Sequence, residues 1–357
     1  MAAAIPRKRA PRRGPKATAA ADRVASVRAA PARGAARARY PGAMRSAFAI
    51  TLVLLSAACG DDDGSADAGA DAATATDGAT PGPDADTADA ATADAAGPDA
   101  APSDAGACAC AEDEACVEGR CVWRPAPGTR FYWQLQGTID PDRDVDMYDV
   151  DLFDAPDDLL ASLQARGVRV VCYFSAGSWE EWRDDAEAFP DAALGNPLDG
   201  WPGERWLDVR DATVRAIMSE RLDHALARGC DGVEPDNMDG YTNDPGFDYG
   251  PTGQADYARF LAAEAHARGL SIGLKNDLDQ IGELVTHFDW ALNEQCFEYD
   301  ECDVYGPFLD ADKAVFQVDY GPASLAETVC PDARALGLSS AVANLALDGS
   351  RWIPCWP

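Results

Sequence analysis

The chain has 357 residues, enough for one large domain or two ordinary ones, and its formal net charge is −31 at pH 7. A protein this acidic does not attract nucleic acid or an anionic membrane surface through its charge, so neither is predicted as a partner. With only three histidines and no glycine-rich phosphate loop, the sequence predicts no metal centre and no cofactor.

Residues 1–59 have the composition of a leader. Residues 1–58 contain twelve Lys and Arg and a single acid, and Met44 offers a second start. After Met44 come one positive charge, an apolar run too short for a transmembrane helix, and small residues before Cys59. This pattern resembles a bacterial lipoprotein signal in which Cys59 would be lipidated, although Ser56 stands where leucine is usual. We interpret the true start as Met44, with a long basic leader from Met1 as the alternative.

Residues 60–107 are built almost entirely from Asp, Ala, Gly, Thr and Pro. They carry twelve Asp and no basic residue, so they cannot bury enough apolar surface to offset the entropy of ordering. We expect a disordered tether between a membrane anchor and a folded domain. The predicted location is therefore outside the cytoplasm, on a lipid anchor or at the cell surface, with the membrane contacted through that anchor only.

A short cysteine-rich segment, residues 108–128, follows the tether. Its four cysteines are Cys108, Cys110, Cys116 and Cys121. In an exported chain two disulfides are favoured over zinc, because Cys-x-Cys is not a usual spacing for structural zinc. We expect this segment to staple the fold.

Residues 129–357 alternate strand and helix patterns. Three helical runs end in Ala-Arg-Gly, before Val168, Cys230 and Leu270, and a fourth ends in Ala-Leu-Gly; each is followed by an apolar strand. The strands are predicted at residues 132–136, 168–174, 205–209, 232–236, 271–275, 290–294, 314–319 and 340–345. Right-handed crossovers would close these eight strands into a (β/α)8 TIM barrel, and an open doubly wound sheet is the alternative.

One helix shows its period clearly, over residues 211–228. Asp211 can cap its first turn. Its apolar residues Val214, Ile217, Met218, Leu222, Ala225 and Leu226 fall on one predicted stripe.

Polar residues gather where the predicted strands end. The stretch 229–240 is the strongest case, with Glu234, Asp236, Asn237 and Asp239 within six positions. In a parallel barrel these ends converge on one face, whereas a single polar end would more simply cap the next helix. Carboxylates and amides interleaved with aromatic rings suit a sugar ligand.

The motifs along residues 131–320 resemble those of family GH114, the endo-α-1,4-polygalactosaminidases. The matching runs include CYFSAGSWEEWR at 172–183, GCDGVEPDNMDGY at 229–241, GLKND at 273–277 and NEQC at 293–296. The resemblance implies a (β/α)8 hydrolase that cleaves α-1,4-linked galactosamine or N-acetylgalactosamine polymers, endo-acting, with Asp236 and Glu294 as its catalytic carboxylates. Little after Tyr320 matches.

Combining the strand ends with these motifs gives a predicted substrate cleft. Its residues are Trp133, Asp140, Tyr173, Ser175, Glu180, Glu204, Asp208, Asn237, Asp239, Lys275, Asp277, Asp319 and Tyr320. A cationic amino-sugar polysaccharide fits an acidic cleft of this kind. We expect a monomer.

The two carboxylates receive different expected roles. Asp236, beside Asn237 and in reach of Lys275, is assigned as the nucleophile; Glu294, near Trp290 and Phe297, as the acid/base, with retention of configuration. Lys275 could equally form a structural ion pair with Asp277 or Asp208. The alternative function is an inactive surface barrel that only binds carbohydrate; a metal-dependent deacetylase would need clustered histidines that the chain lacks.

Six further cysteines lie in the barrel domain. Cys296 and Cys302 are the safest pair because they close a short loop, and Cys330 with Cys355 could fix the tail. Cys172 lies within a predicted strand and could be either a disulfide partner or a buried thiol.

Overall fold

The computed structural model describes residues 108–356. The leader, Cys59 and the tether therefore lie outside the described residues. None of the helices within the described part is long and apolar enough to cross a membrane.

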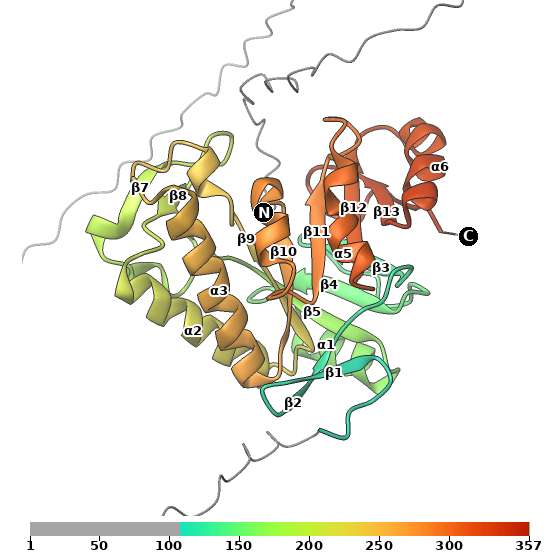
Figure 1. Cartoon of the computed structure of the whole chain (residues 1–357), viewed down its shortest axis with the longest axis horizontal. Coiled ribbons are helices and arrows are strands. Elements are labelled where there is room, and N and C mark those ends of the chain that lie inside the picture. Colours follow the sequence, from blue (N-terminus) through green and yellow to red (C-terminus); the bar gives the residue numbers. More distant parts are fainter. Residues whose placement is uncertain (1–107, 357) are drawn as a thin grey trace, which may run out of the picture. The chain divides into compact units, whose positions relative to one another are not determined.

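A nine-stranded sheet forms the centre of the fold (Figure 1). Eight strands are parallel and follow one another in chain order. They are β3 (Phe131–Gln134), β4 (Met147–Asp151), β5 (Arg169–Ser175), β9 (Gly232–Asp236), β10 (Ser271–Lys275), β11 (Trp290–Glu294), β12 (Val315–Tyr320) and β13 (Ser339–Ala343). The ninth, β14 (Trp352–Pro354), runs antiparallel to β13.

The two edges of this sheet approach each other. The indole of Trp352 on β14 lies 5.1 Å from the ring of Phe131 and 5.3 Å from that of Tyr132, both on β3. The backbone N–H groups of Leu135 and Gln136 donate to the carbonyl of Leu347. The sheet is therefore nearly closed, like a barrel.

Helices connect most of the parallel strands. They are α1 (Asp157–Ala165), α2 (Ala212–Ala227), α3 (Gly250–Arg268), α4 (Ile281–Leu284), α5 (Gly306–Asp310) and α6 (Ala326–Leu336). Figure 1 shows α2 and α3 side by side on one flank of the sheet. No helix connects β3 to β4 within the described chain, so the fold is a mixed α/β barrel without complete β/α alternation.

One predicted barrel strand was wrong. Residues 205–207 of that predicted strand lie in a separate antiparallel sheet of β6 (Ser178–Glu180), β8 (Glu204–Leu207) and β7 (Leu194–Pro197), inserted between β5 and α2, and residues 208–209 lie in no strand. The barrel strand that was not predicted from the sequence is β4. It was missed because Asp149 and Asp151 interrupt it with acids, yet both carboxylates are buried in the structure.

Helix α2 confirms most of the predicted stripe. The side chain of Asp211 accepts hydrogen bonds from the N–H groups of Thr213 and Val214, as expected of an N-cap. The exception is Leu226, which is 48% exposed, while Arg221 is buried in its place. Arg221 is drawn inward because its guanidinium binds Asp185 and the carbonyl of Ser175.

The cysteine-rich segment forms a hairpin of β1 (Glu114–Val117) and β2 (Arg120–Trp123). Its disulfides join Cys108 to Cys116 and Cys110 to Cys121, which confirms the stapling prediction. Cys108, Cys110 and Cys121 lie close enough together to suggest a metal site, but their sulfur atoms are used in these bonds. The carbonyl of Pro125 bonds the N–H of Ala314, just before β12, so the segment covers the amino-terminal end of the barrel.

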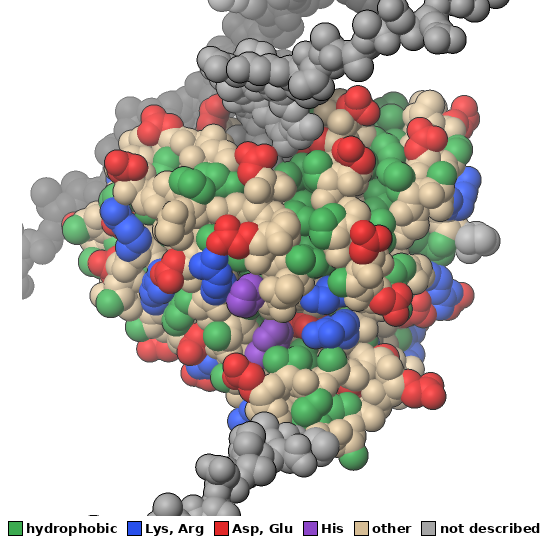
Figure 2. All heavy atoms as spheres, viewed as in Figure 1, with side chains coloured by type: hydrophobic (Ala, Val, Ile, Leu, Met, Phe, Trp, Pro, Cys, Tyr) green, Lys and Arg blue, Asp and Glu red, His purple; other side chains and the backbone are tan. Residues whose placement is uncertain are grey.

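The other six cysteines are also paired. Cys296 bonds Cys302 and Cys330 bonds Cys355, as expected. Cys172 on β5 bonds Cys230 just before β9, which resolves the alternative in favour of a disulfide. Figure 2 shows acidic side chains spread across the visible face and not confined to one patch.

Candidate active site

The ends of three neighbouring strands bring one cation and three carboxylates together. β9, β10 and β11 are parallel and adjacent, so their carboxyl ends share one edge of the barrel. Glu234 and Asp236 are two positions apart on β9 and therefore point to the same side. Lys275 ends β10 and Glu294 ends β11.

The ammonium of Lys275 is the centre of this cluster. Its Nζ lies 2.5 Å from Oε1 of Glu234. Since Oδ1 of Asp236 is 3.2 Å and Oε2 of Glu294 is 3.5 Å from the same Nζ, these two oxygens are at most about 6.7 Å apart, the sum of the two distances. The side chains of all four residues are 2% exposed or less. The predicted contact of Lys275 with Asp236 is therefore present, and no ion pair joins Lys275 to Asp277 or Asp208 among the described residues.

The charges of the cluster keep Lys275 protonated. Burial by itself would lower the pKa of Lys275, but the charges of Asp236, Glu234 and Glu294 outweigh it and raise that pKa well above its usual value. The Lys275 Nζ also lies 4.6 Å from the centre of the Trp133 ring, a cation–π distance. Lys275 is thus a fixed positive charge in contact with the three carboxylates.

Glu234 and Asp149 form a second pair of neighbouring buried carboxyl groups. Burial raises the pKa of Glu234 to about 7, although Lys275 acts in the opposite direction. Burial and the charge of Glu234 raise the pKa of Asp149 well above its usual value. Neither oxygen of Asp149 has a hydrogen-bond donor within residues 108–356, and Oε2 of Glu234 has none either. A proton held between Asp149 and Glu234 would provide one hydrogen bond between the two carboxyl groups.

Phenol and amide groups orient the two proposed catalytic carboxylates. Tyr173 donates its hydroxyl to Oδ2 of Asp236 at 3.1 Å, and Tyr320 donates to Oε1 of Glu294 at 2.5 Å. Burial and the neighbouring carboxylates raise the pKa of both tyrosines well above the usual value, so both remain donors. Asn276 holds Glu294 from the other side, with its Nδ2 3.2 Å from Oε2.

The backbone turns sharply at each of these strand ends. Asn237, Asn276, Asp277 and Gln295 follow β9, β10 and β11 with φ values of 61°, 49°, 42° and 65°. This left-handed region is uncommon for residues other than glycine, and Asn and Asp tolerate it best. Such strain is frequent at functional sites, where surrounding contacts hold it in place.

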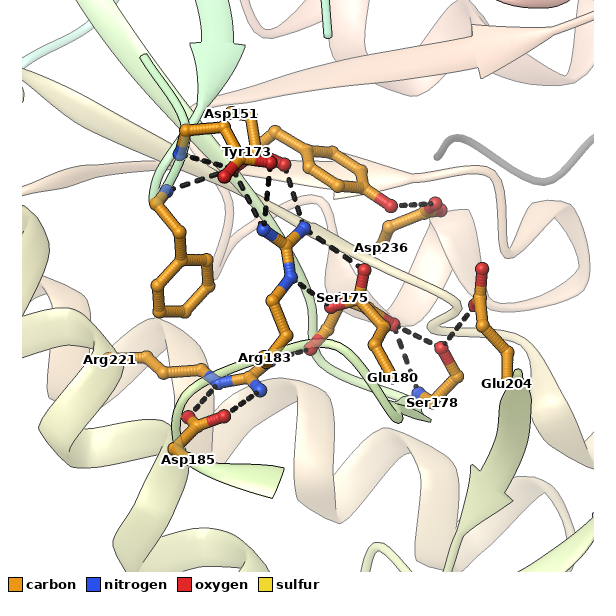
Figure 3. Close-up of polar contacts among 12 residues, drawn as sticks. Asp151, Tyr173, Ser175, Ser178, Glu180, Arg183, Asp185, Glu204, Arg221 and Asp236 are labelled. Carbon is orange, nitrogen blue, oxygen red and sulfur yellow. Dashed lines mark hydrogen bonds and ion pairs between the residues drawn. The ribbon is translucent and has the colours of Figure 1, made fainter. Parts of the chain in front are cut away.

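The inserted sheet forms one wall beside Asp236 (Figure 3). Gly177 lies so close to β9 that a Cβ there would be 1.8 Å from the carbonyl oxygen of Asn237. The Oγ atoms of Ser175 and Ser178 are 2.6 Å apart, and Nδ2 of Asn237 donates to Ser175 at 2.9 Å. Ser178 in turn donates to Oε2 of Glu204 at 2.8 Å.

Other charges in this wall have a supporting role. The guanidinium of Arg183 binds both oxygens of Glu180 and both oxygens of Asp151, as Figure 3 shows. All three side chains are buried. Glu180 is therefore occupied by an internal ion pair and fixes the loop after β6.

The remaining predicted cleft residues lie around the cluster. Asp239 and Asp277 are buried after β9 and β10, and Tyr241 donates to Asp277. Asp319 accepts from Gln317 and from the N–H of Glu298. Asp208 pairs with Arg210, and Asp140 is an exposed residue paired with Arg143. The structure therefore brings Asp140 and Asp208 into none of the contacts around Lys275.

Four residues of the site were absent from the predicted set: Glu234, Asp149, Asn276 and Ser178. For Glu234 a signal was present, since strand periodicity puts residues 234 and 236 on one face. Asn276 lies within the strand-end run of residues 275–277. Asp149 carried no signal of this kind, because its buried neighbours come from distant parts of the chain.

The comparisons with known proteins agree with this arrangement. A family model described as glycoside-hydrolase family GH114 matches residues 113–355. The crystal structure of Ega3 from Aspergillus fumigatus, in complex with galactosamine, is similar at 43% identity and a TM-score of 0.61, over 63% of this chain and 95% of that one. The glycoside hydrolase domain of PelA from Pseudomonas aeruginosa has a similar fold, with 14% identity, a TM-score of 0.50, and coverage of 61% and 96%. No curated protein sequence matches the chain.

Proposed function

The chain belongs to glycoside hydrolase family GH114 and is a glycoside hydrolase, and we propose that it cleaves α-1,4-linked galactosamine or N-acetylgalactosamine polysaccharide, endo-acting and with retention of configuration. The observation that carries this proposal is the convergence of Asp236 and Glu294 on one lysine ammonium. The galactosamine bound to the 43% identical Ega3 supports an amino sugar as the substrate.

Asp236 is the proposed nucleophile. Its carboxylate attacks the anomeric carbon and forms an ester with the sugar, while the bond to the leaving oxygen breaks. Tyr173 and Lys275 hold that carboxylate in position.

Glu294 is the proposed acid/base. In the first step it gives its proton to the leaving oxygen, and in the second it takes a proton from the water that cleaves the ester. Retaining enzymes hold their two carboxyl groups roughly 5–5.5 Å apart and inverting ones roughly 6.5–9.5 Å. The two oxygens that contact Lys275 are at most about 6.7 Å apart, a limit compatible with the shorter separation that retention requires.

A polymer needs room beyond the cleaved bond. A cavity of about 450 Å³ includes Tyr320 in its lining and continues over Phe297, Leu325 and Glu298. Aromatic and acidic groups of this kind suit a further amino-sugar unit. This supports endo action on a chain of several units.

The test is product analysis with the purified protein. Fully deacetylated and N-acetylated α-1,4 galactosamine oligomers are incubated with it; mass spectrometry gives the cleavage positions and NMR the anomer first released. We expect internal cleavage and an α-anomeric product. A β-anomeric first product would contradict retention, and binding without products would favour a carbohydrate-binding barrel.

We also propose an exported protein anchored through a lipid on Cys59. The support is the lipoprotein-type segment that ends at this cysteine. In the native host, Cys59→Ser is expected to move the protein from the membrane fraction to the medium or periplasm. A mature protein that starts elsewhere and carries no lipid would contradict the anchor.

A further inference from the structure

Several buried carboxylates beside the site pair with a cation, and Glu204 is a buried carboxylate of the inserted sheet that does not do so within residues 108–356. Lys275 serves Glu234, Asp236 and Glu294, Arg183 serves Glu180 and Asp151, and Arg221 serves Asp185. Glu204 is 2% exposed, and no ion pair to it exists within residues 108–356. Burying a carboxylate without a neighbouring cation costs free energy, so the contacts of Glu204 need an explanation.

The two oxygens of Glu204 differ. Oε2 accepts the hydroxyl of Ser178 at 2.8 Å, and Ser178 is itself fixed through Ser175 and Asn237. Oε1 has no hydrogen-bond donor among the described residues. The hydrogen bond at Oε2 therefore orients the carboxylate, and Oε1 can accept a hydrogen bond from a ligand.

Glu204 lies beside the proposed nucleophile. β8 is bound to the end of β5 by the N–H of Leu207, which donates to the carbonyl of Gly177, and Gly177 packs against Asn237. The charge of Asp236 contributes to the raised pKa of Glu204, so the two carboxylates are within electrostatic reach, and Figure 3 shows them in the same part of the site.

We propose that Oε1 of Glu204 receives the 2-ammonium group of the galactosamine unit whose anomeric carbon faces Asp236, and that this contact selects the deacetylated sugar. The inference rests on the proposed function and narrows its substrate to the amine form. Nitrogen on C2 is adjacent to the carbon under attack, so a group beside Asp236 is in the correct region to bind it. An acetamide carries no charge and cannot neutralise the carboxylate.

The pKa of Glu204 agrees with this assignment. Burial, together with the charges of Glu180 and Asp236, raises the pKa of Glu204 to about 7, although the Ser178 hydrogen bond lowers it. An ammonium bound at Oε1 would favour the charged form and form a charge-assisted hydrogen bond.

The experiment measures sugar binding without turnover. Calorimetry gives the affinities of the wild-type protein, Glu204→Gln and Glu187→Gln for galactosamine and for N-acetylgalactosamine. Glu187 is an exposed carboxylate in the same inserted segment and controls for the loss of one charge. We expect the wild type and Glu187→Gln to prefer galactosamine, and Glu204→Gln to bind galactosamine about 10- to 100-fold more weakly with little change for N-acetylgalactosamine.

Three results would overturn the assignment: a wild-type protein without preference for galactosamine, an equal loss of affinity for both sugars in Glu204→Gln, or no loss. If Glu204→Gln does not fold, Glu204→Asp is measured instead, because it keeps the negative charge but shortens the side chain by one methylene. An unchanged preference of Glu204→Asp for galactosamine over N-acetylgalactosamine would then refute the contact. Hydrolysis of galactosamine polymer by the same wild-type preparation is assayed in parallel. Its absence would count against the proposed function, and the binding preference would still be measured.

Discussion

Asp236 and Glu294 make different contacts although both lie against Lys275. Asp236 also accepts the Tyr173 hydroxyl and the N–H of Asn237, which suits a carboxylate that attacks. Glu294 accepts from Tyr320 and from Asn276. Their proposed roles therefore depend on separate sets of neighbours and can be tested separately.

Removing either charge should stop catalysis without unfolding the protein. We expect Asp236→Asn and Glu294→Gln each to lower kcat by at least about 100-fold, because each removes a group that forms a bond or transfers a proton in the reaction. For a retaining enzyme, added azide should restore part of the activity of Glu294→Gln on a substrate with a good leaving group. Steady-state rates beside Glu187→Gln provide the comparison. Full activity in either variant would remove that residue from the mechanism.

The buried charge of Glu204 should also reduce stability in a pH-dependent way. Its pKa is about 7 in the folded protein against a usual 4.5, so the folded state holds the proton more tightly and loses stability as pH rises between these two values. Glu204→Gln should therefore be more stable than the wild type at pH 8, by on the order of 3 kcal/mol at most, and similar to it at pH 4. Thermal unfolding at both pH values measures this difference. A difference that does not depend on pH would show that Glu204 carries no such strain.

At the scale of elements, the position of the inserted sheet depends on its contact with β9. Leu207 bonds the carbonyl of Gly177, and Gly177 meets Asn237 with no space for a side chain. Tyr257 on α3 donates to the carbonyl of Ala176 and fixes the same turn from outside. The wall that carries Glu204 is therefore placed by backbone contacts at the end of β5.

Gly177→Ala should disturb this junction. A Cβ 1.8 Å from a backbone carbonyl forces β5 and β9 apart, and we expect a stability loss of roughly 1–3 kcal/mol with a fall in kcat/KM. Gly282→Ala is the matched control, because it lies in α4 with no atom near its Cβ position and should be neutral or slightly stabilising. Denaturant unfolding and initial rates compare the two. Equal behaviour would mean that the junction moves freely.

At the scale of the whole molecule, the negative charge is large and spread over the surface. Residues 129–357 contain 44 acids and 16 bases, and Figure 2 shows acids scattered across the visible face among basic and uncharged groups. A cationic polymer would be attracted by this field from a distance, and salt screens such attraction over about 10 Å at 0.1 M.

Salt should therefore affect the two forms of substrate differently. Between low salt and about 0.5 M, kcat/KM on deacetylated polymer is expected to fall several-fold, while the value on neutral, N-acetylated polymer changes little. Initial rates over a salt series at fixed pH measure both. Equal responses would mean that the acidity serves solubility only.

The sequence by itself determined the α/β class of the fold and predicted the principal residues. Glycines after helical runs and the apolar strands that follow them are local signals, because a helix stop or a strand depends on residues a few positions apart. The catalytic roles of Asp236 and Glu294 come from the resemblance of the motifs at residues 229–241 and 293–296 to family GH114, and they stay a prediction. Two disulfides of the barrel domain followed from the positions of the cysteines near loops and the tail.

Only the tertiary structure decided which charges meet. Strand β4 could not be recognised from MYDVD, because the cation that pairs with Asp151 is Arg183, 32 positions away, and the carboxyl group beside the buried Asp149 is that of the distant Glu234. The same applies to Glu204, because the strand predicted at residues 205–209, just after it, was assigned to the barrel but belongs to the inserted sheet beside Asp236. The energy of a buried charge depends on neighbours that the fold supplies, so no local pattern could specify it.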